Sequence, residues 1–221
     1  MVLSESGETP AISLKEIMEE QKQERRRRIR KEQKNLQPEV PKTFTIQNLN
    51  SKSKEYKNIY ERLHNNKGFR DKFQVFRIKK VTNEALLGLY KAKRKSKTYK
   101  ENLCFHGTPI RNLKSILTNN FNVSKCEIRR GKFGWGVSFA KCPYYATHYS
   151  KNNCDESTRV MIIVKVLIGK SHEGNHKSMM PEEGYDTTTS PDGQVIVKYE
   201  ENTFYPQYVV YFGERDEINK E

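Results

Sequence analysis

Cysteine is scarce in this chain, and its few cysteines are not spaced as metal ligands or redox pairs. The 221 residues contain no C-x-x-C pair, and the four cysteines are Cys104, Cys126, Cys142 and Cys154. A zinc site needs paired ligands, and the nearby His148 completes no recognisable set. The sequence therefore predicts reduced structural thiols, no metal, and a cytoplasmic or nuclear protein.

Long apolar runs are equally scarce. The longest run, Val160–Ile168, is interrupted by Lys165. It is much shorter than the ~20 residues that span a bilayer, and no secretory signal pattern is visible. We therefore expect a protein with no membrane segment.

Aromatic residues are absent from the first part of the chain, since Phe44 is the first of them. Residues 1–42 are therefore expected to form a separate charged segment, helical or disordered, in front of the core. Ser13 and Glu16 fit a capping box, and the basic run Arg25–Lys31 follows. That run is either a nuclear address or nucleic-acid contact, or a solvated charged helix.

Acidic residues are outnumbered, with 27 against 41 lysines and arginines and a net charge of +14. Such an excess favours anionic partners, such as nucleic acid, acidic proteins or a phosphorylated ligand, or it only solvates a surface.

From residue 43 onward the apolar residues follow helix and strand periods. Tyr56, Ile59, Tyr60 and Leu63 recur at helical spacing, and Asn83 is placed to cap a second helix. A third helix would carry Leu113, Ile116 and Leu117. The expected strands are Phe73–Val81, Leu103–Phe105, Gly136–Ala140, Val160–Ile168, Gln194–Tyr199 and Tyr208–Phe212. We predict an α+β domain over residues 43–213 with a mostly antiparallel sheet, followed by a charged tail, 214–221.

Three stretches carry the chemistry-bearing residues. In Phe105–Thr108, "FHGT", a strand ends on a histidine followed by glycine, which allows a close approach to the backbone. Gly131–Ser150 combines closely spaced glycines with a run of aromatic residues. The third stretch is Gly193–Phe212. Taken singly, a histidine at a strand end or an aromatic run is more typical of structural residues than of a ligand site.

Taken together and in order, these motifs resemble the catalytic domain of the poly(ADP-ribose) polymerase family. The segments SKSKEYKNIYERLHNN, FRIKKVTNEALLGLYKAKRK, FHGT, GVSFAK, VLIGKSHEGN, GYD and YPQYVVYF are similar to its small mono-ADP-ribosyltransferase branch. That branch includes the TCDD-inducible member and the zinc-finger antiviral protein. The resemblance implies the ADP-ribosyltransferase fold, a split sheet with helices packed around it. It also implies NAD as substrate, acceptor proteins as partners, no metal and a monomer.

The resemblance also implies a set of NAD-binding residues. His106 would hydrogen-bond the adenosine ribose, Gly107 would offer its backbone to the nicotinamide amide, Thr108 would add a ribose contact, and Tyr149 would stack on the nicotinamide ring. The full implied set is His106, Gly107, Thr108, Tyr145, Ala146 and Tyr149.

The catalytic His, Tyr and Glu of the polymerising branch are matched here by His106, Ser138 and Val195. His106 retains the histidine, whereas Ser138 and Val195 depart from the pattern, and Ala146 is a third departure. Valine cannot polarise an acceptor, so we expect transfer of one ADP-ribose unit rather than chain elongation. Ser138 removes an aromatic ring that Trp135 could replace, and Ala146 stands where the family usually has an amide-binding serine.

Two functions remain open after these departures. One is a protein mono-ADP-ribosyltransferase that releases nicotinamide. The other is a catalytically impaired binding or scaffolding module. Nucleic-acid contacts through Arg25–Lys31 are compatible with either function.

Overall fold

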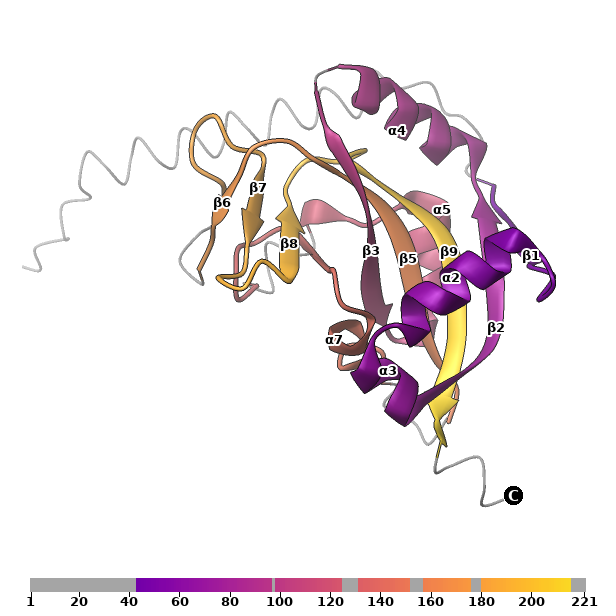
Figure 1. Ribbon diagram of the computed structural model, residues 1–221. Coiled ribbons are helices and arrows are strands. Elements are labelled where there is room, and N and C mark those ends of the chain that lie inside the picture. The colour runs from indigo at the N-terminus through magenta and orange to yellow at the C-terminus, as the bar shows by residue number, and fades with distance from the viewer. Residues whose placement is uncertain (1–42, 97, 125–130, 152–156, 176–179, 216–221) are drawn as a thin grey trace, which may run out of the picture. The chain divides into compact units, whose positions relative to one another are not determined.

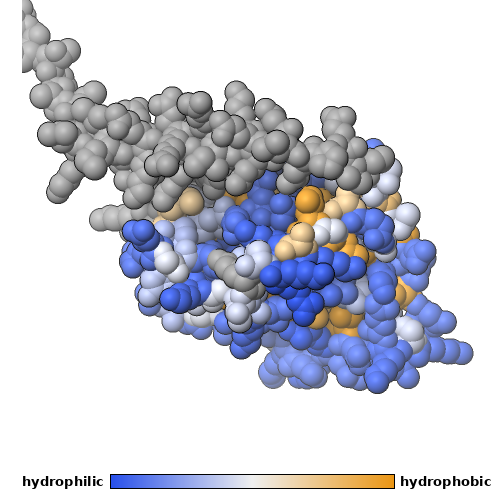
Figure 2. Space-filling view, turned by 90° about the horizontal axis from the view of Figure 1, so that it is seen from above, coloured by the Kyte–Doolittle hydropathy of each residue, from blue (hydrophilic) through white to orange (hydrophobic). Residues whose placement is uncertain are grey.

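The computed structural model describes residues 43–96, 98–124, 131–151, 157–175 and 180–215 (Figure 1). The N-terminal segment 1–42, Cys126, Cys154 and all but two residues of the tail 214–221 lie outside these ranges. The expected capping box and the domain boundaries therefore remain predictions. Seen from above, hydrophilic residues cover most of the coloured surface of the domain (Figure 2).

The early helices form where the sequence predicts them. Helix α2 spans Lys54–His64 and buries Ile59 and Leu63. Helix α4 spans Glu84–Lys95, and the Asn83 side chain caps it by accepting a hydrogen bond from the Leu86 N–H at 3.1 Å. Ser53 caps α2 in the same way, by accepting a hydrogen bond from the Tyr56 N–H. Both caps satisfy a backbone donor that has no partner within the helix.

The strands form one nine-stranded sheet in the order β1-β2-β9-β5-β3-β4-β8-β7-β6. Among the described pairings only β6 with β7 is parallel, which confirms the mostly antiparallel sheet. Their bounds are β1 Thr45–Asn48, β2 Phe73–Thr82, β3 Lys100–Thr108, β4 Val137–Ala140, β5 Arg159–Ile168, β6 Ser171–Glu173, β7 Thr187–Thr189, β8 Val195–Lys198 and β9 Phe204–Glu214.

The expected split of the sheet lies between β3 and β4. Strand β3 pairs with β5 over nine residues, from Lys100 to Thr108. Its register with β4 consists of one pair, Phe105 with Ala140. Beyond Phe105 the described structure therefore places a strand on only one edge of β3.

The core lies on both faces of β5, because its side chains alternate between two clusters. Val160, Ile162 and Val164 join one cluster, which also contains residues of α5 (Leu113–Asn119). Met161 and Ile163 join the other, under α2 and α3 (Lys67–Lys72). All five side chains are fully buried. Figure 1 shows α2 and α3 in front of the sheet and α5 behind it.

The sequence did not predict six short elements, which are β1, β6, β7, α3, the 3₁₀ turn Ile110–Asn112 and α7 (Pro143–Thr147). They are too short to show a hydrophobic period. Within the described residues, no helix combines the length and apolarity needed to cross a bilayer. Neither described cysteine is in a disulfide, and burial raises the pKa of the Cys104 thiol to about 12.

Candidate active site

His106 lies on β3 directly beyond the residue that joins the two halves of the sheet. Its Nδ1 atom is 3.0 Å from the carbonyl oxygen of Ser138. Because a carbonyl only accepts, Nδ1 carries the proton and donates, which leaves Nε2 as an acceptor. Burial lowers the pKa of His106 below its ordinary value of 6.5, although the bond to Ser138 acts in the opposite direction. The imidazole is therefore neutral at pH 7.

Two phenylalanines hold the His106 ring in place. Its centroid is 4.8 Å from that of Phe121 and 5.9 Å from that of Phe139, and both rings are steeply inclined to the imidazole. Phe121 and Phe139 are buried, whereas His106 keeps partial exposure. The site therefore has an oriented imidazole that still reaches the surface. The sequence did not identify the two phenylalanines as part of the site, because their pattern indicated only core residues.

Gly107 is packed against α7. A Cβ atom at this position would lie 1.8 Å from the carbonyl oxygen of Ala146 and 2.8 Å from its carbonyl carbon. The helix backbone thus requires glycine here, whether or not a ligand is present. This adds a structural cause to the expected role of Gly107 in presenting its backbone to an amide.

The neighbouring residues on β3 and β4 differ in exposure. Thr108 is buried, and its hydroxyl accepts a hydrogen bond from the Asn112 side chain at 3.1 Å. Ser138 is exposed on β4, opposite Val197 of β8. Thr108 is therefore already engaged within the protein, while the Ser138 hydroxyl faces solvent.

Two tyrosines of the α7 region contact each other. The hydroxyls of Tyr145 and Tyr149 are 3.3 Å apart and their ring centroids are 5.8 Å apart. Burial and the hydrogen bond to Tyr149 raise the pKa of Tyr145 to about 12. Tyr149 is 58% exposed, so a face of its ring is accessible for stacking.

Val195 begins β8 and pairs with Ala140 of β4. It is buried in an apolar cluster against which Tyr145 packs. The expected site residues therefore fall into contacting pairs. Tyr145 packs against the cluster of Val195 and contacts Tyr149. Gly107 packs against Ala146, and His106 contacts the backbone of Ser138. The structure gives no direct contact between His106 and Tyr149.

The glycine-rich segment before β4 is attached to the small end of the sheet. Gly134 has φ +133°, and a Cβ there would lie 1.7 Å from the Tyr199 hydroxyl. The Thr188 hydroxyl donates to the Phe133 carbonyl oxygen at 2.7 Å. These contacts fix the backbone directly before Trp135, which is half-buried. Thr188 and Tyr199 show no sequence signal for this role.

The edge of β3 beside Gly107 is available for hydrogen bonding in the part of the chain that the structure describes. Beyond Phe105 the described residues place a neighbouring strand on only one edge of the strand that contains Gly107, and a strand edge offers N–H and C=O groups to a ligand. No group of three His, Cys, Asp or Glu residues within the described ranges is arranged to hold a metal ion.

Residues 53–214 match the family described as the Poly(ADP-ribose) polymerase catalytic domain. Because the match covers most of the chain, the protein belongs to this family, as the motifs indicated. PARP domains use NAD⁺ as substrate.

Several curated proteins are similar to the chain. It is 29% identical over 180 residues to human "Protein mono-ADP-ribosyltransferase PARP12", covering 74% of this chain and 25% of that protein. It is 22% identical over 214 residues to mouse "Protein mono-ADP-ribosyltransferase PARP11", covering 80% and 62%. A 27% match over 108 residues involves Arabidopsis thaliana "Probable inactive poly [ADP-ribose] polymerase SRO1", covering 45% and 19%. The chain thus spans between about a fifth and three fifths of these relatives.

Proposed function

We propose that the protein is an NAD-dependent mono-ADP-ribosyltransferase that transfers one ADP-ribose unit to protein side chains. The observation that carries the proposal is the oriented, neutral His106 beside an open edge of β3. Its Nε2 atom is available to accept a hydrogen bond from a ribose hydroxyl. The similarity to two proteins named as mono-ADP-ribosyltransferases supports the same reaction.

The reaction breaks the bond between the nicotinamide nitrogen and C1′ of the ribose. The acceptor atom forms the new bond to C1′, its proton passes to solvent, and nicotinamide leaves. His106 and the edge of β3 would orient the two halves of the substrate, and orientation supplies a large part of such rate enhancements. Val195 has no group that could activate a ribose hydroxyl for a second transfer, so the reaction stops at one unit.

The test is incubation of the full chain with labelled NAD and detection of labelled protein. We expect label on the wild type, and we expect His106→Ala to abolish it. His172→Ala is the matched control, because His172 lies on β6 and is absent from the proposed site. Equal labelling of the His106→Ala and His172→Ala variants would remove His106 from the mechanism.

A catalytically impaired binding module is the second candidate. Ala146 and Val195, both buried, and the exposed Ser138 favour it, because none of the three side chains can supply a ring or a carboxylate. Calorimetry with millimolar NAD separates the two functions: the transferase requires heat of binding, and the impaired module gives none. In the second case, the double variant Ser138→Tyr, Ala146→Ser should restore measurable binding.

A further inference from the structure

Helix α2 carries an aromatic column that is separate from the candidate active site. Tyr56, Tyr60 and His64 follow one another at intervals of four residues, so they lie on one side of the helix. The Tyr56 and Tyr60 rings stack at 5.9 Å between centroids, and the Tyr60 and His64 rings at 3.8 Å. Residues of the proposed NAD site take no part in this column.

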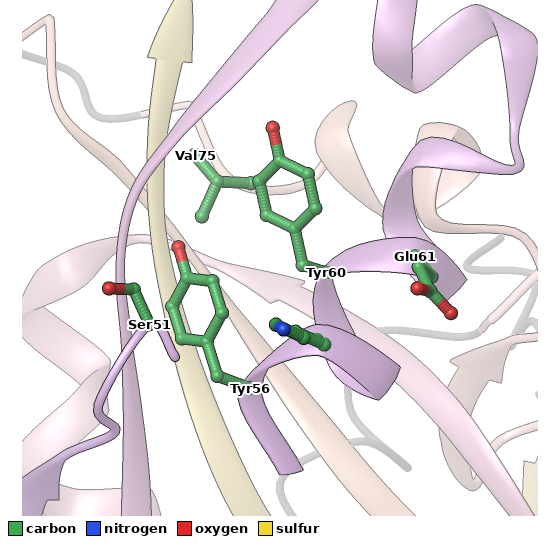
Figure 3. A pocket seen from close by; sticks show the side chains of 6 residues that line it. Ser51, Tyr56, Tyr60, Glu61 and Val75 are labelled. Carbon is green, nitrogen blue, oxygen red and sulfur yellow. The ribbon is translucent and has the colours of Figure 1, made fainter. Parts of the chain in front are cut away.

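The two tyrosines flank a surface hollow of about 420 Å³. Their rings project from α2 on the same side, with Ser51 beside Tyr56 and Val75 beside Tyr60 (Figure 3). Lys57 and Glu61 complete the lining. We call this hollow the α2 groove. A fully structural role does not account for it, because Tyr60 is 37% exposed and the helix is anchored by Ile59 and Leu63.

The charge of the domain is concentrated in the segment that builds this groove. Residues 43–100 contain 16 lysines and arginines against four acidic residues, whereas residues 101–215 contain 14 against 12. Two of the four carboxylates are already in ion pairs, Glu55 with Lys80 at 2.9 Å and Asp71 with Lys67. Positive charge therefore predominates in the segment of the chain that contains the groove.

Three lysines at the start of α2 have no carboxylate partner among the described residues, and each is exposed: Lys52, Lys54 and Lys57. Of the three, Lys57 lines the groove, and Lys52 and Lys54 follow the lining residue Ser51 closely in the sequence. Cationic side chains placed beside accessible aromatic rings are the arrangement by which proteins hold single-stranded nucleic acid, with phosphates on the cations and bases on the rings.

We propose that the α2 groove binds single-stranded nucleic acid. A base contacts the Tyr56 and Tyr60 rings, and the phosphates on either side of it contact Lys57 and its neighbours. A duplex would not fit this arrangement, because its bases are stacked on one another and present no free face. An acidic peptide would satisfy the lysines, but it would leave the rings without a planar partner.

The proposal is independent of two earlier hypotheses, nucleic-acid contact through Arg25–Lys31 and NAD binding at the candidate active site. The basic run Arg25–Lys31 lies outside the described residues, and the α2 groove contains none of the residues proposed to bind NAD. The function it adds is recruitment of the domain to a polynucleotide.

The experiment measures binding of the full chain to fluorescein-labelled rU12 and rA12 by fluorescence anisotropy at several salt concentrations. Loss of one stacked base costs about 1–3 kcal/mol, so we expect Tyr60→Leu to weaken binding about fivefold or more. Tyr185→Leu is the matched control, since Tyr185 is 40% exposed and is not part of the groove. Native thermal unfolding of each variant excludes a folding defect.

The salt dependence tests the lysines. Each phosphate contact on a single strand contributes about 0.7 to the slope of log affinity against log salt, so Lys57→Gln should reduce the slope by about that amount. Lys114→Gln, an exposed lysine of α5, should leave the slope unchanged. Three results would overturn the proposal. The first is equal RNA affinity of the Tyr60→Leu and Tyr185→Leu variants, and the second is an equal affinity of the wild type for a duplex of the same length. The third is displacement of the RNA by poly-glutamate when neither tyrosine substitution changes the RNA affinity.

Discussion

Replacement of Gly107 by alanine tests the packing of β3 against α7. The new methyl carbon would lie 1.8 Å from the Ala146 carbonyl oxygen, whereas ordinary contacts lie at 3.4–4 Å. The obstacle is backbone, which cannot rotate away as a side chain can. Overpacking of a core costs ~1–3 kcal/mol, and we expect the upper part of that range.

The expected consequence is a large fall in thermal stability. For a domain of this size, 1 kcal/mol shifts the Tm by about 2–4 °C, so a loss of about 3 kcal/mol lowers it by about 6–12 °C. Differential scanning calorimetry of the full chain measures this shift. Isothermal titration calorimetry measures whether NAD binding is lost with it.

Gly88→Ala is the matched control. Gly88 lies within α4, and a Cβ there would meet no heavy atom within 4 Å. Alanine is favoured over glycine in helix interiors by about 0.5–1 kcal/mol, so this variant should unfold at a slightly higher temperature. A Gly107→Ala protein that unfolds at or above the wild-type temperature would refute the reasoning. If that protein had also lost NAD binding, the glycine would be required by the ligand alone.

Two further predictions concern stability. Asn83→Ala should cost about 2–3 kcal/mol in urea unfolding, because it removes the α4 cap and the 2.9 Å bond to the Leu117 carbonyl oxygen. Ser53 is the N-cap of α2 and accepts a hydrogen bond from the Tyr56 N–H, and the Ser53→Ala variant should lose about 1 kcal/mol. Equal losses of unfolding free energy in the Asn83→Ala and Ser53→Ala variants would contradict the buried role of Asn83. Glu55 accepts from Lys80 and Tyr208, which lower its pKa below 4.5. Its contribution to stability is therefore present above pH 4.5 and lost as the pH falls through the lowered value. Glu55→Gln should flatten that part of the stability–pH curve, and an unchanged curve would contradict the assignment.

Much of the fold was predictable from local patterns. The helical spacing from Tyr56 to Leu63, the Asn83 cap and the almost continuous apolar run of β5 each specify an element without reference to the rest of the chain. Short elements such as α3 and β7 were not predictable because they form only when a neighbouring strand or helix stabilises them.

The site was predictable only in part. The FHGT motif identified His106 and Gly107, and the order of the motifs identified the family. The phenylalanines that flank His106 were missed, because Phe121 and Phe139 lie in stretches where a phenylalanine is an ordinary core residue. The tautomer of His106 also depended on a carbonyl 32 residues away in the sequence.

The sequence alone determined that this protein has an α+β domain of the poly(ADP-ribose) polymerase family, because periodicity, caps and ordered motifs are properties of neighbouring residues. Tertiary structure decided why Gly107 must be glycine, which tautomer His106 adopts, and that Tyr56 and Tyr60 border an accessible groove. These three properties depend on how segments distant in the chain approach one another. No local pattern records those distances.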